Sequence, residues 1–274
     1  MIHCILIIGS SRFDTGLSML KSASNPDVKI YVVWRGFSEI PSVPSEIKPF
    51  YEVSVTDCSL SKGRNILLQQ IFNSVDISDD EIVCFADDDG LWPPDLPEKL
   101  KLVFAEEVFW ALGRYGPANN VISKRFPSNP ISSLSLRKLL MLGSSLGIYA
   151  RVGLLKSIGL FDEFLGLGTD ILIGEDTDFL IRLYKHMPEA QYRPELFQIH
   201  EFGNEVSLDR MKDSLEFYIH IMRKGTYLPL EFFQRTLVLR IRGIISSKEA
   251  FRFARRWIVT RLNPDPVIKK HQVG

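Results

Sequence analysis

The sequence predicts an α/β fold with a mainly parallel, twisted, Rossmann-like sheet that carries helices on both faces, followed by C-terminal helices. Apolar, β-branched segments of strand length alternate with segments of helical periodicity over about the first 200 residues. Such alternation implies crossover connections, which place consecutive strands parallel. From Leu208 onward the pattern is helical throughout.

The expected elements follow one another in strand–helix order. Ser61 is the expected N-cap of the second helix, and Pro93 and Pro94 are expected to open the third. The segment 115–140 is rich in Gly, Pro, Asn and Ser and is expected to form a long loop, after which apolar structure resumes at 139–158. The expected strands are 2–8, 29–34, 51–55 and 81–86, and the expected helices include 15–24, 62–73 and 174–185.

The composition is that of an ordinary globular protein. Apolar residues make up 45% of the 274 and charged residues 24%, which excludes a mainly disordered chain and permits a core without disulfides. No apolar run approaches the ~18 residues of a membrane-spanning helix. Cysteines 4, 58 and 84 fit neither a disulfide framework nor a zinc site, and no signal peptide is evident. We therefore expect a reducing, cytoplasmic setting.

The run Asp87, Asp88, Asp89, directly after a predicted buried strand, is the strongest single feature. Adjacent carboxylates repel one another unless a cation is present, and hard oxygen ligands favour Mg²⁺ or Mn²⁺. In parallel sheets, ligands bind beyond the carboxyl ends of the strands. The run therefore indicates a metal site, and the alternative is a solvated turn that caps the following helix.

Three further stretches admit a chemical role and a structural one. Lys62 and Arg64 fall in the first turn of a predicted helix, where cations oppose the helix dipole unless an anion binds there; the alternative is a solvated basic turn. Glu175 and Asp176 begin another predicted helix. They either include a general base or are simply the acids that the helix dipole favours in a first turn. His200 follows a strand-like run and is either a metal ligand or a structural residue.

Taken together, these stretches resemble the nucleotide-sugar glycosyltransferases of the GT-A fold, family 2, over residues 1 to about 202. The order and spacing of the motifs make the joint match specific. The family transfers a sugar from a nucleoside diphosphate donor to an acceptor hydroxyl, usually with inversion at the anomeric carbon. The matching segments are KGRN at 62–65, ADDDG at 86–90 (the DxD motif), GLFDEFLGLG at 159–168, GEDTDFLIRL at 174–183 and the stretch 192–200 that ends in His.

The resemblance implies a role for each matching residue. Asp87 and Asp89 would hold the donor's ribose and the metal, with Asp88 assisting, and the metal would neutralise the leaving diphosphate. Asp176 would be the base that takes the acceptor proton, and Glu175 would support it. The remaining implied contacts are His200 to the metal, and Lys62, Arg64 and Asn65 to the nucleotide or its phosphates.

One segment departs from the family pattern. Many members carry a base-recognising Asp in a "VDdgS" segment after the second strand, whereas this chain has VWRG at 33–36. The missing carboxylate leaves the identity of the nucleotide base open. We expect Arg35, together with Arg12 and Asp14 after the first strand, to supply part of the contact to the base.

Charge is unevenly distributed along the chain. Residues 235–262 contain eight Arg and Lys but one acid. On one predicted apolar side, the residues that recur at helical spacing are Phe251, Ala254, Trp257, Ile258 and Leu262. Such a helix is typical either of an anchor on an anionic membrane surface or of a helix that packs its apolar side on the catalytic domain. The aromatic interleaving needed for base stacking is absent, so we expect no nucleic-acid partner.

The sequence thus predicts an inverting, metal-dependent glycosyltransferase that uses Mn²⁺ or Mg²⁺ and a nucleoside-diphosphate sugar. By resemblance, it would act on a saccharide or lipid-linked acceptor in bacterial surface-polysaccharide or glycolipid assembly, in the cytoplasm or peripherally on the inner face of the membrane. A nucleotidyltransferase, a glycosidase and a catalytically degenerate GT-A domain that binds a partner are the alternatives. The expected regions are a catalytic domain at 1–205, with a nucleotide-binding half at 1–114 and an acceptor half at 115–205, and a basic helical extension at 206–274.

Overall fold

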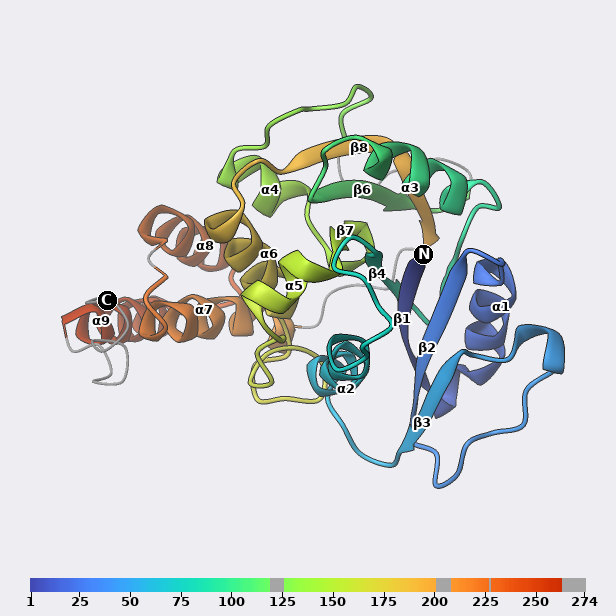
Figure 1. Cartoon of the computed structure of the whole chain (residues 1–274). Coiled ribbons are helices and arrows are strands. Elements are labelled where there is room, and N and C mark those ends of the chain that lie inside the picture. Colours follow the sequence, from blue (N-terminus) through green and yellow to red (C-terminus); the bar gives the residue numbers. More distant parts are fainter. Residues whose placement is uncertain (119–125, 201–207, 227, 263–274) are drawn as a thin grey trace. The chain divides into compact units, whose positions relative to one another are not determined.

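The computed structural model describes residues 1–118, 126–200, 208–226 and 228–262 (Figure 1). The chain divides into two compact units. The first comprises Met1–Glu163 and Glu175–Phe202, and the second comprises Phe164–Gly174 and Gly203–Gly274. The expected boundary between residues 205 and 206 lies outside the described residues. Within the described ranges, no helix has both the length and the apolar character needed to cross a bilayer.

The first unit is built on an eight-stranded sheet, and the predicted fold class is confirmed. The strand order is β3-β2-β1-β4-β7-β6-β8-β5. β1 pairs parallel with β2 and β4, as expected, but β7 runs antiparallel to β4 and β6, and β5 antiparallel to β8. The strands are β1 (Ile2–Gly9), β2 (Val28–Arg35), β3 (Tyr51–Val55), β4 (Ile82–Asp87), β5 (Gly90–Leu91), β6 (Trp110–Gly116), β7 (Ile148–Arg151) and β8 (Gln191–His200).

The residues expected to start α2 and α3 are not the ones that the structure uses. The N-cap of α2 is Ser59, whose Oγ accepts a hydrogen bond from the Lys62 backbone N–H, whereas Ser61 is buried inside the helix. The prolines at 93 and 94 precede α3, which begins at Leu96. The helices of this unit are α1 (Phe13–Ala23), α2 (Leu60–Phe72), α3 (Leu96–Ala105), α4 (Leu136–Leu142), α5 (Val152–Ile158) and α6 (Glu175–His186).

Helices cover both faces of the sheet, as the continuous apolar run in β1 predicts. Because successive side chains of a strand point to opposite faces, Ile5 and Ile7 join one core and Leu6 and Ile8 the other. α2, α5 and α6 contribute to the first core, and α1 and α3 to the second. The segment predicted as a loop at 115–140 contains the end of β6 and the start of α4, and residues 119–125 of it lie outside the described part.

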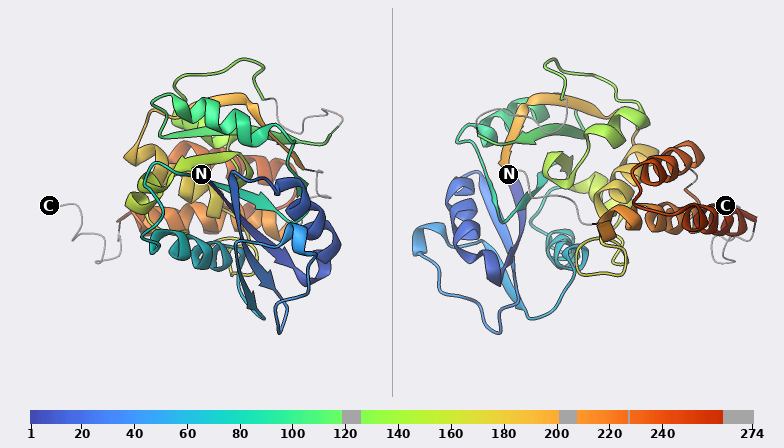
Figure 2. Two further views of the ribbon diagram at one scale, coloured as in Figure 1. Left: turned by 45° about the vertical axis from the view of Figure 1, so that its right-hand side comes forward. Right: turned by 180° about the vertical axis from the view of Figure 1, so that it is seen from behind.

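The second unit contains α7 (Leu208–Arg223), α8 (Pro229–Ile241) and α9 (Ser247–Leu262), which pack side by side (Figure 2). Its core includes Phe232, Phe253 and Trp257, and the Phe232 and Trp257 rings stack at 5.3 Å between centroids. The prediction that α9 has a single apolar side is wrong. Trp257 faces the core of this unit, whereas Phe251 and Ile258 are exposed, because the helix is apolar on two sides.

Candidate active site

The acidic run lies at the carboxyl end of β4, at the edge of the sheet where ligands bind in open α/β folds. Asp87 is the last residue of β4, and Asp88 and Asp89 form the turn into β5. β5 pairs antiparallel with β8 so that Gly90 lies opposite His200. The strand register, rather than proximity in sequence, therefore brings His200 to the acidic turn.

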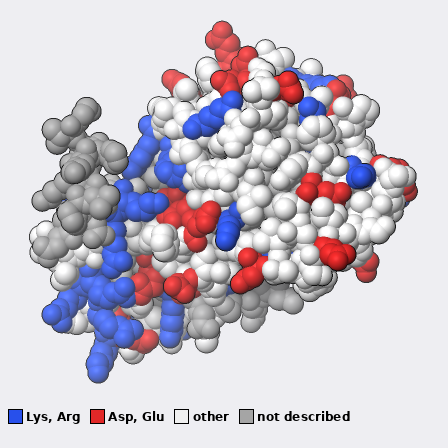
Figure 3. Space-filling model, turned by 60° about the horizontal axis from the view of Figure 1, so that its bottom comes forward, with Lys and Arg blue, Asp and Glu red and all other residues white. Residues whose placement is uncertain are grey.

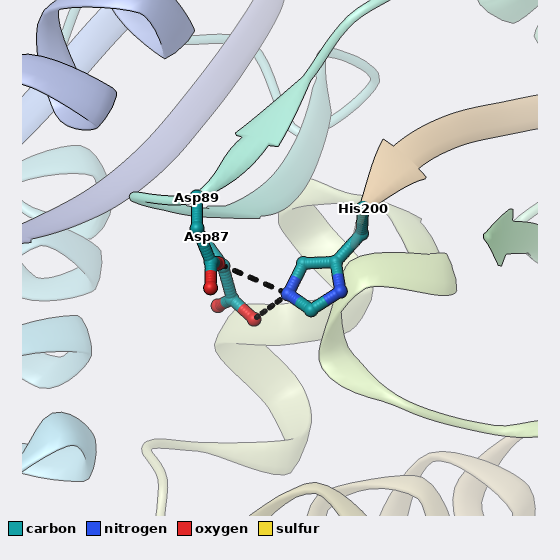
Figure 4. A group of neighbouring side chains, drawn as sticks. All are labelled: Asp87, Asp89 and His200. Carbon is teal, nitrogen blue, oxygen red and sulfur yellow. Dashed lines mark ion pairs between the residues drawn. The ribbon is translucent and has the colours of Figure 1, made fainter. Parts of the chain in front are cut away.

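Asp87, Asp89 and His200 point toward one another (Figure 4). His200 Nε2 lies 3.0 Å from Asp89 Oδ1 and 3.7 Å from Asp87 Oδ2, and one potential ligand atom from each residue lies within 4.8 Å of the others. Two carboxylates and an imidazole fit a divalent first-row cation such as Mn²⁺, whereas Mg²⁺ prefers oxygen ligands alone. The three side chains are each partly exposed, which leaves access for a substrate.

The charges in this cluster depend on one another. The hydrogen bond with His200, together with Arg12, lowers the pKa of Asp89 to about 2 despite partial burial. Burial lowers the pKa of His200, but the hydrogen bond to Asp89 and the negative charge of Asp87 outweigh it and raise the pKa overall. Because a metal binds neutral imidazole, cation binding competes with protonation of His200.

Asp88 ties the turn to the end of β1. Its Oδ2 accepts a hydrogen bond from the Gly9 backbone N–H at 2.9 Å, and its Oδ1 accepts one from Arg12 Nη1 at 3.3 Å. Arg12 also pairs with Asp89. A Cβ at Gly9 would lie 3.5 Å from Asp88 Oδ2 and 3.9 Å from Arg35 Nη2, so both side chains converge on the end of β1. Burial raises the pKa of Asp88 in spite of these donors.

Arg64 connects the acidic turn to Asp176. Its side chain extends from α2, is 2% exposed and donates to Asp176 Oδ1 at 3.0 Å and to Ser145 Oγ at 2.8 Å. Its Nη2 also lies 3.6 Å from Asp87 Oδ1. Asp176 Oδ2 accepts hydrogen bonds from the Ser145 N–H at 2.9 Å and from the Ser145 Oγ at 3.1 Å. No pattern in the sequence singles out Ser145, since serine after glycine and serine is common in loops.

The first turn of α6 contains three acids in different environments. Asp176 contacts Arg64, and Asp178 is buried in an ion pair with Arg182 at 2.9 Å. Burial and the neighbouring charge of Asp176 raise the pKa of Glu175 to about 7, which the Arg64 cation only partly offsets. A carboxyl group that titrates near neutrality beside a hydrogen-bonded carboxylate is typical of a catalytic centre.

Asn65 serves as a structural clamp. Its side chain accepts from the Phe161 N–H at 2.8 Å and donates to the Phe161 carbonyl at 2.9 Å and to Glu163 Oε1 at 2.9 Å. The hydrogen bonds of the Asn65 amide therefore hold α2 against the 161–163 segment and are not directed at the acidic turn.

The other predicted nucleotide contacts lie at the same edge of the sheet but outside the cluster. Arg35 ends β2 and is half-buried, whereas Lys62 on α2 and Asp14 on α1 are exposed. Among the described residues, no hydrogen bond or ion pair joins these three side chains to Asp87 or Asp89.

Gln198 positions His200 and was not identified from the sequence. It is 1% exposed, and its Nε2 donates to the carbonyls of Phe85 at 3.0 Å and Leu146 at 2.7 Å, while its Oε1 accepts from Trp92 Nε1. These bonds fix β8 two residues before His200. A polar residue between two apolar ones in a strand is the signal that could have located it.

Several solved structures share this fold. Two crystal structures of S. aureus TarS align with this chain at a TM-score of 0.58. The 1–349 form is 14% identical, and the alignment covers 87% of this chain and 69% of the TarS chain. A longer form is 15% identical, and the alignment covers 87% of this chain and 42% of the TarS chain. Mannosyltransferase PcManGT from Pyrobaculum calidifontis, in complex with GDP-Man and Mn²⁺, aligns at 0.55 with 13% identity over 99% of this chain and 78% of its own.

No family model and no curated protein matches the chain. At 13–15% identity, the structural likeness shows the fold alone. The chain shares the fold of these solved structures, and the carboxyl edge of its sheet carries a set of residues that fits a divalent cation.

Proposed function

We propose that the protein is an inverting, metal-dependent glycosyltransferase that moves a sugar from a nucleoside-diphosphate donor to an acceptor hydroxyl. The observation that carries the proposal is the link from the Asp87–Asp89–His200 cluster through buried Arg64 to Asp176. The fold supports it, because a mannosyltransferase of the same fold is in complex with GDP-Man and Mn²⁺.

Asp87, Asp89 and His200 are the residues proposed to hold Mn²⁺ or Mg²⁺. When bound, the cation would stabilise the charge that develops on the leaving diphosphate. Asp88 keeps the turn in place through the Gly9 N–H. The donor nucleotide is proposed to lie along the ends of β1 and β2. The side chains proposed to contact it are Arg12, Asp14, Arg35, Lys62 and Arg64.

Asp176 is proposed as the base that takes the proton from the acceptor hydroxyl. Arg64 and Ser145 hold its carboxylate in a fixed orientation, which general-base catalysis requires. Attack by the activated hydroxyl on the side of the sugar opposite the diphosphate inverts the anomeric carbon. Glu175 supports this base: while protonated, it adds no second negative charge beside Asp176.

The regions of the chain are proposed to divide these tasks. Residues 1–114 would bind the donor through the acidic turn. Residues 115–205 would present Asp176 to the acceptor and supply His200 to the metal, with 206–274 as an extension. We propose a saccharide or lipid-linked saccharide as the acceptor, in bacterial surface-polysaccharide or glycolipid assembly on the cytoplasmic side of the membrane.

Nucleotide binding by the purified protein tests the donor site. Thermal and isothermal titrations with nucleoside diphosphates and their sugars, with and without Mn²⁺, should identify one base that stabilises the fold. A ligand at about 100 times its dissociation constant contributes about 2.7 kcal/mol. Asp89→Asn should abolish the metal-dependent shift and donor hydrolysis. Asp95→Asn, at an exposed acid paired with Lys99, is the matched control and should preserve both. No shift with any nucleotide would contradict the proposal and favour a catalytically degenerate binding domain.

A further inference from the structure

α8 carries an apolar stripe that faces solvent. Leu230, Phe233, Leu237 and Ile241 are between 44% and 75% exposed, and their spacing of three, four and four residues places them on one side of the helix. Phe232 and other core residues already pack the opposite side into the unit. The Phe233 ring also packs edge-on against Trp257 at 5.2 Å, whereas the rest of the outward stripe is additional to what folding of the unit uses.

α9 repeats this arrangement. Phe251, Ile258 and Leu262 are between 48% and 72% exposed and fall on one side of the helix, while Phe253 and Trp257 fill the core on the other. Single exposed apolar residues are ordinary, but several on one side of each of two successive helices are characteristic of an interaction surface.

The acids on α8 and α9 are Glu231 and Glu249, and the other charged residues of these helices are basic. The single acid in 235–262 is Glu249, whose carboxylate accepts from the Ser246 N–H and pairs with Lys212. Arg242, Lys248 and Arg255 are exposed, and in the described part of the chain no carboxylate pairs with them. Figure 3 shows Lys and Arg side chains gathered over the C-terminal helices, at the lower left of the view.

We propose that the outward faces of α8 and α9 form a docking surface for an anionic lipid bilayer, on which the helices lie in the plane of the interface. The apolar stripes would enter the boundary between headgroups and acyl chains, and the unpaired Arg and Lys side chains would contact lipid phosphates. A second copy of the chain is a poorer occupant, because it would oppose cations to cations. The inference is independent of the proposed sugar transfer.

Vesicle co-sedimentation of the full chain tests the surface. The protein should bind vesicles of phosphatidylglycerol and phosphatidylcholine in equal parts at low salt, be released at high salt, and not bind pure phosphatidylcholine. One cation near the surface changes partitioning by about fivefold. The triple variant Arg242→Gln, Lys248→Gln, Arg255→Gln should therefore bind on the order of a hundredfold more weakly. The double variant Phe251→Ser, Ile258→Ser should weaken binding without changing its salt dependence.

A matched control separates location from net charge. A second triple variant removes the same charge from exposed positions on α1 and α4 and should bind as the unaltered protein does. Its substitutions are Lys21→Gln, Arg137→Gln and Lys138→Gln. Circular dichroism should show that each variant is folded. The proposal is overturned if anionic and neutral vesicles bind alike, if neither binds, or if the control loses binding equally. A lipid-free dimer that Phe251→Ser dissociates would instead assign the surface to self-association.

Discussion

The acidic turn and the α8–α9 surface carry opposite charge, and the fold treats that charge in opposite ways. In the turn, every carboxylate has a partner inside the unit: Asp87 has Arg64, Asp88 has the Gly9 N–H, and Asp89 has His200. Beside the apolar side chains that α8 and α9 expose, the exposed cations Arg242, Lys248 and Arg255 have no carboxylate partner among the described residues.

This difference distinguishes a site from a docking surface. Charges that a fold pairs internally are held in fixed positions, as binding and catalysis require. Charges that a fold leaves unpaired contribute little to its stability and can interact with a partner. Substitutions in the turn should therefore affect chemistry and stability, whereas substitutions on the outward helical faces should affect association alone.

The largest effect is expected for Asp176→Asn. Removal of a general base lowers the rate of the chemical step by about 10²–10⁴-fold. Donor binding should be unchanged, since the cation ligands remain. Steady-state and single-turnover transfer assays measure the loss. Asp178→Asn on the same helix is the control. Because Asp178 pairs with Arg182, this substitution should reduce stability without a comparable loss of rate. Equal losses of rate in the two variants would contradict the assignment.

A second comparison contrasts the two sides of α9. Phe253→Ala should lower the free energy of unfolding by about 3–5 kcal/mol, because Phe253 is 4% exposed in the core of its unit. Phe251→Ala, at a 72% exposed position, should change it by less than about 0.5 kcal/mol. Denaturant titrations measure both values. If Phe251→Ala is also costly, the outward stripe is part of a core and the comparison fails.

Arg64→Met tests the internal pairing directly. It leaves Asp87 and Asp176 without their shared cation, and we expect the free energy of unfolding to fall by about 2–3 kcal/mol. The decrease stays moderate because both carboxylates retain partial access to water. Arg255→Met removes an equal charge from an unpaired position and should change stability by less than about 0.5 kcal/mol. Similar values for the two variants would show that pairing does not distinguish the regions.

The smallest effect concerns Glu175 and pH. Its pKa is raised from 4.5 to about 7, so the folded state favours the protonated form. The resulting contribution to stability is present below pH 4.5 and is lost as the pH rises through 7. With both proteins free of metal, the unaltered protein should therefore lose more stability between pH 5 and 8 than the Glu175→Gln variant does. Parallel pH profiles for the two proteins would contradict this.

Local pattern was sufficient to locate most elements of the first unit. The apolar run of β1, the β-branched residues of β2 and the acidic break after β4 all appear where the sequence places them, within one residue or two. Ser59, not Ser61, caps α2, because either serine satisfies the local preference and only packing determines which one becomes buried.

The candidate site was predicted as a set of residues but not as a geometry. Lys62 and Arg64 look alike in the KGRN segment, yet Lys62 is exposed and Arg64 is buried against carboxylates. Helical periodicity alone gives no reason for this, because the partner Asp176 lies 112 residues away. Ser145 and Gln198 were missed for the same reason: their importance comes from what they contact.

By itself, the sequence determined the α/β class, the acidic turn at a strand end and the basic, helical C-terminal region, because these depend on interactions between near neighbours. The tertiary structure alone decided that the pairing of Gly90 with His200 completes the cluster and that Arg64 joins it to Asp176. It also decided which side of α9 is buried. Such contacts depend on strand register and packing between distant segments, which periodicity does not encode.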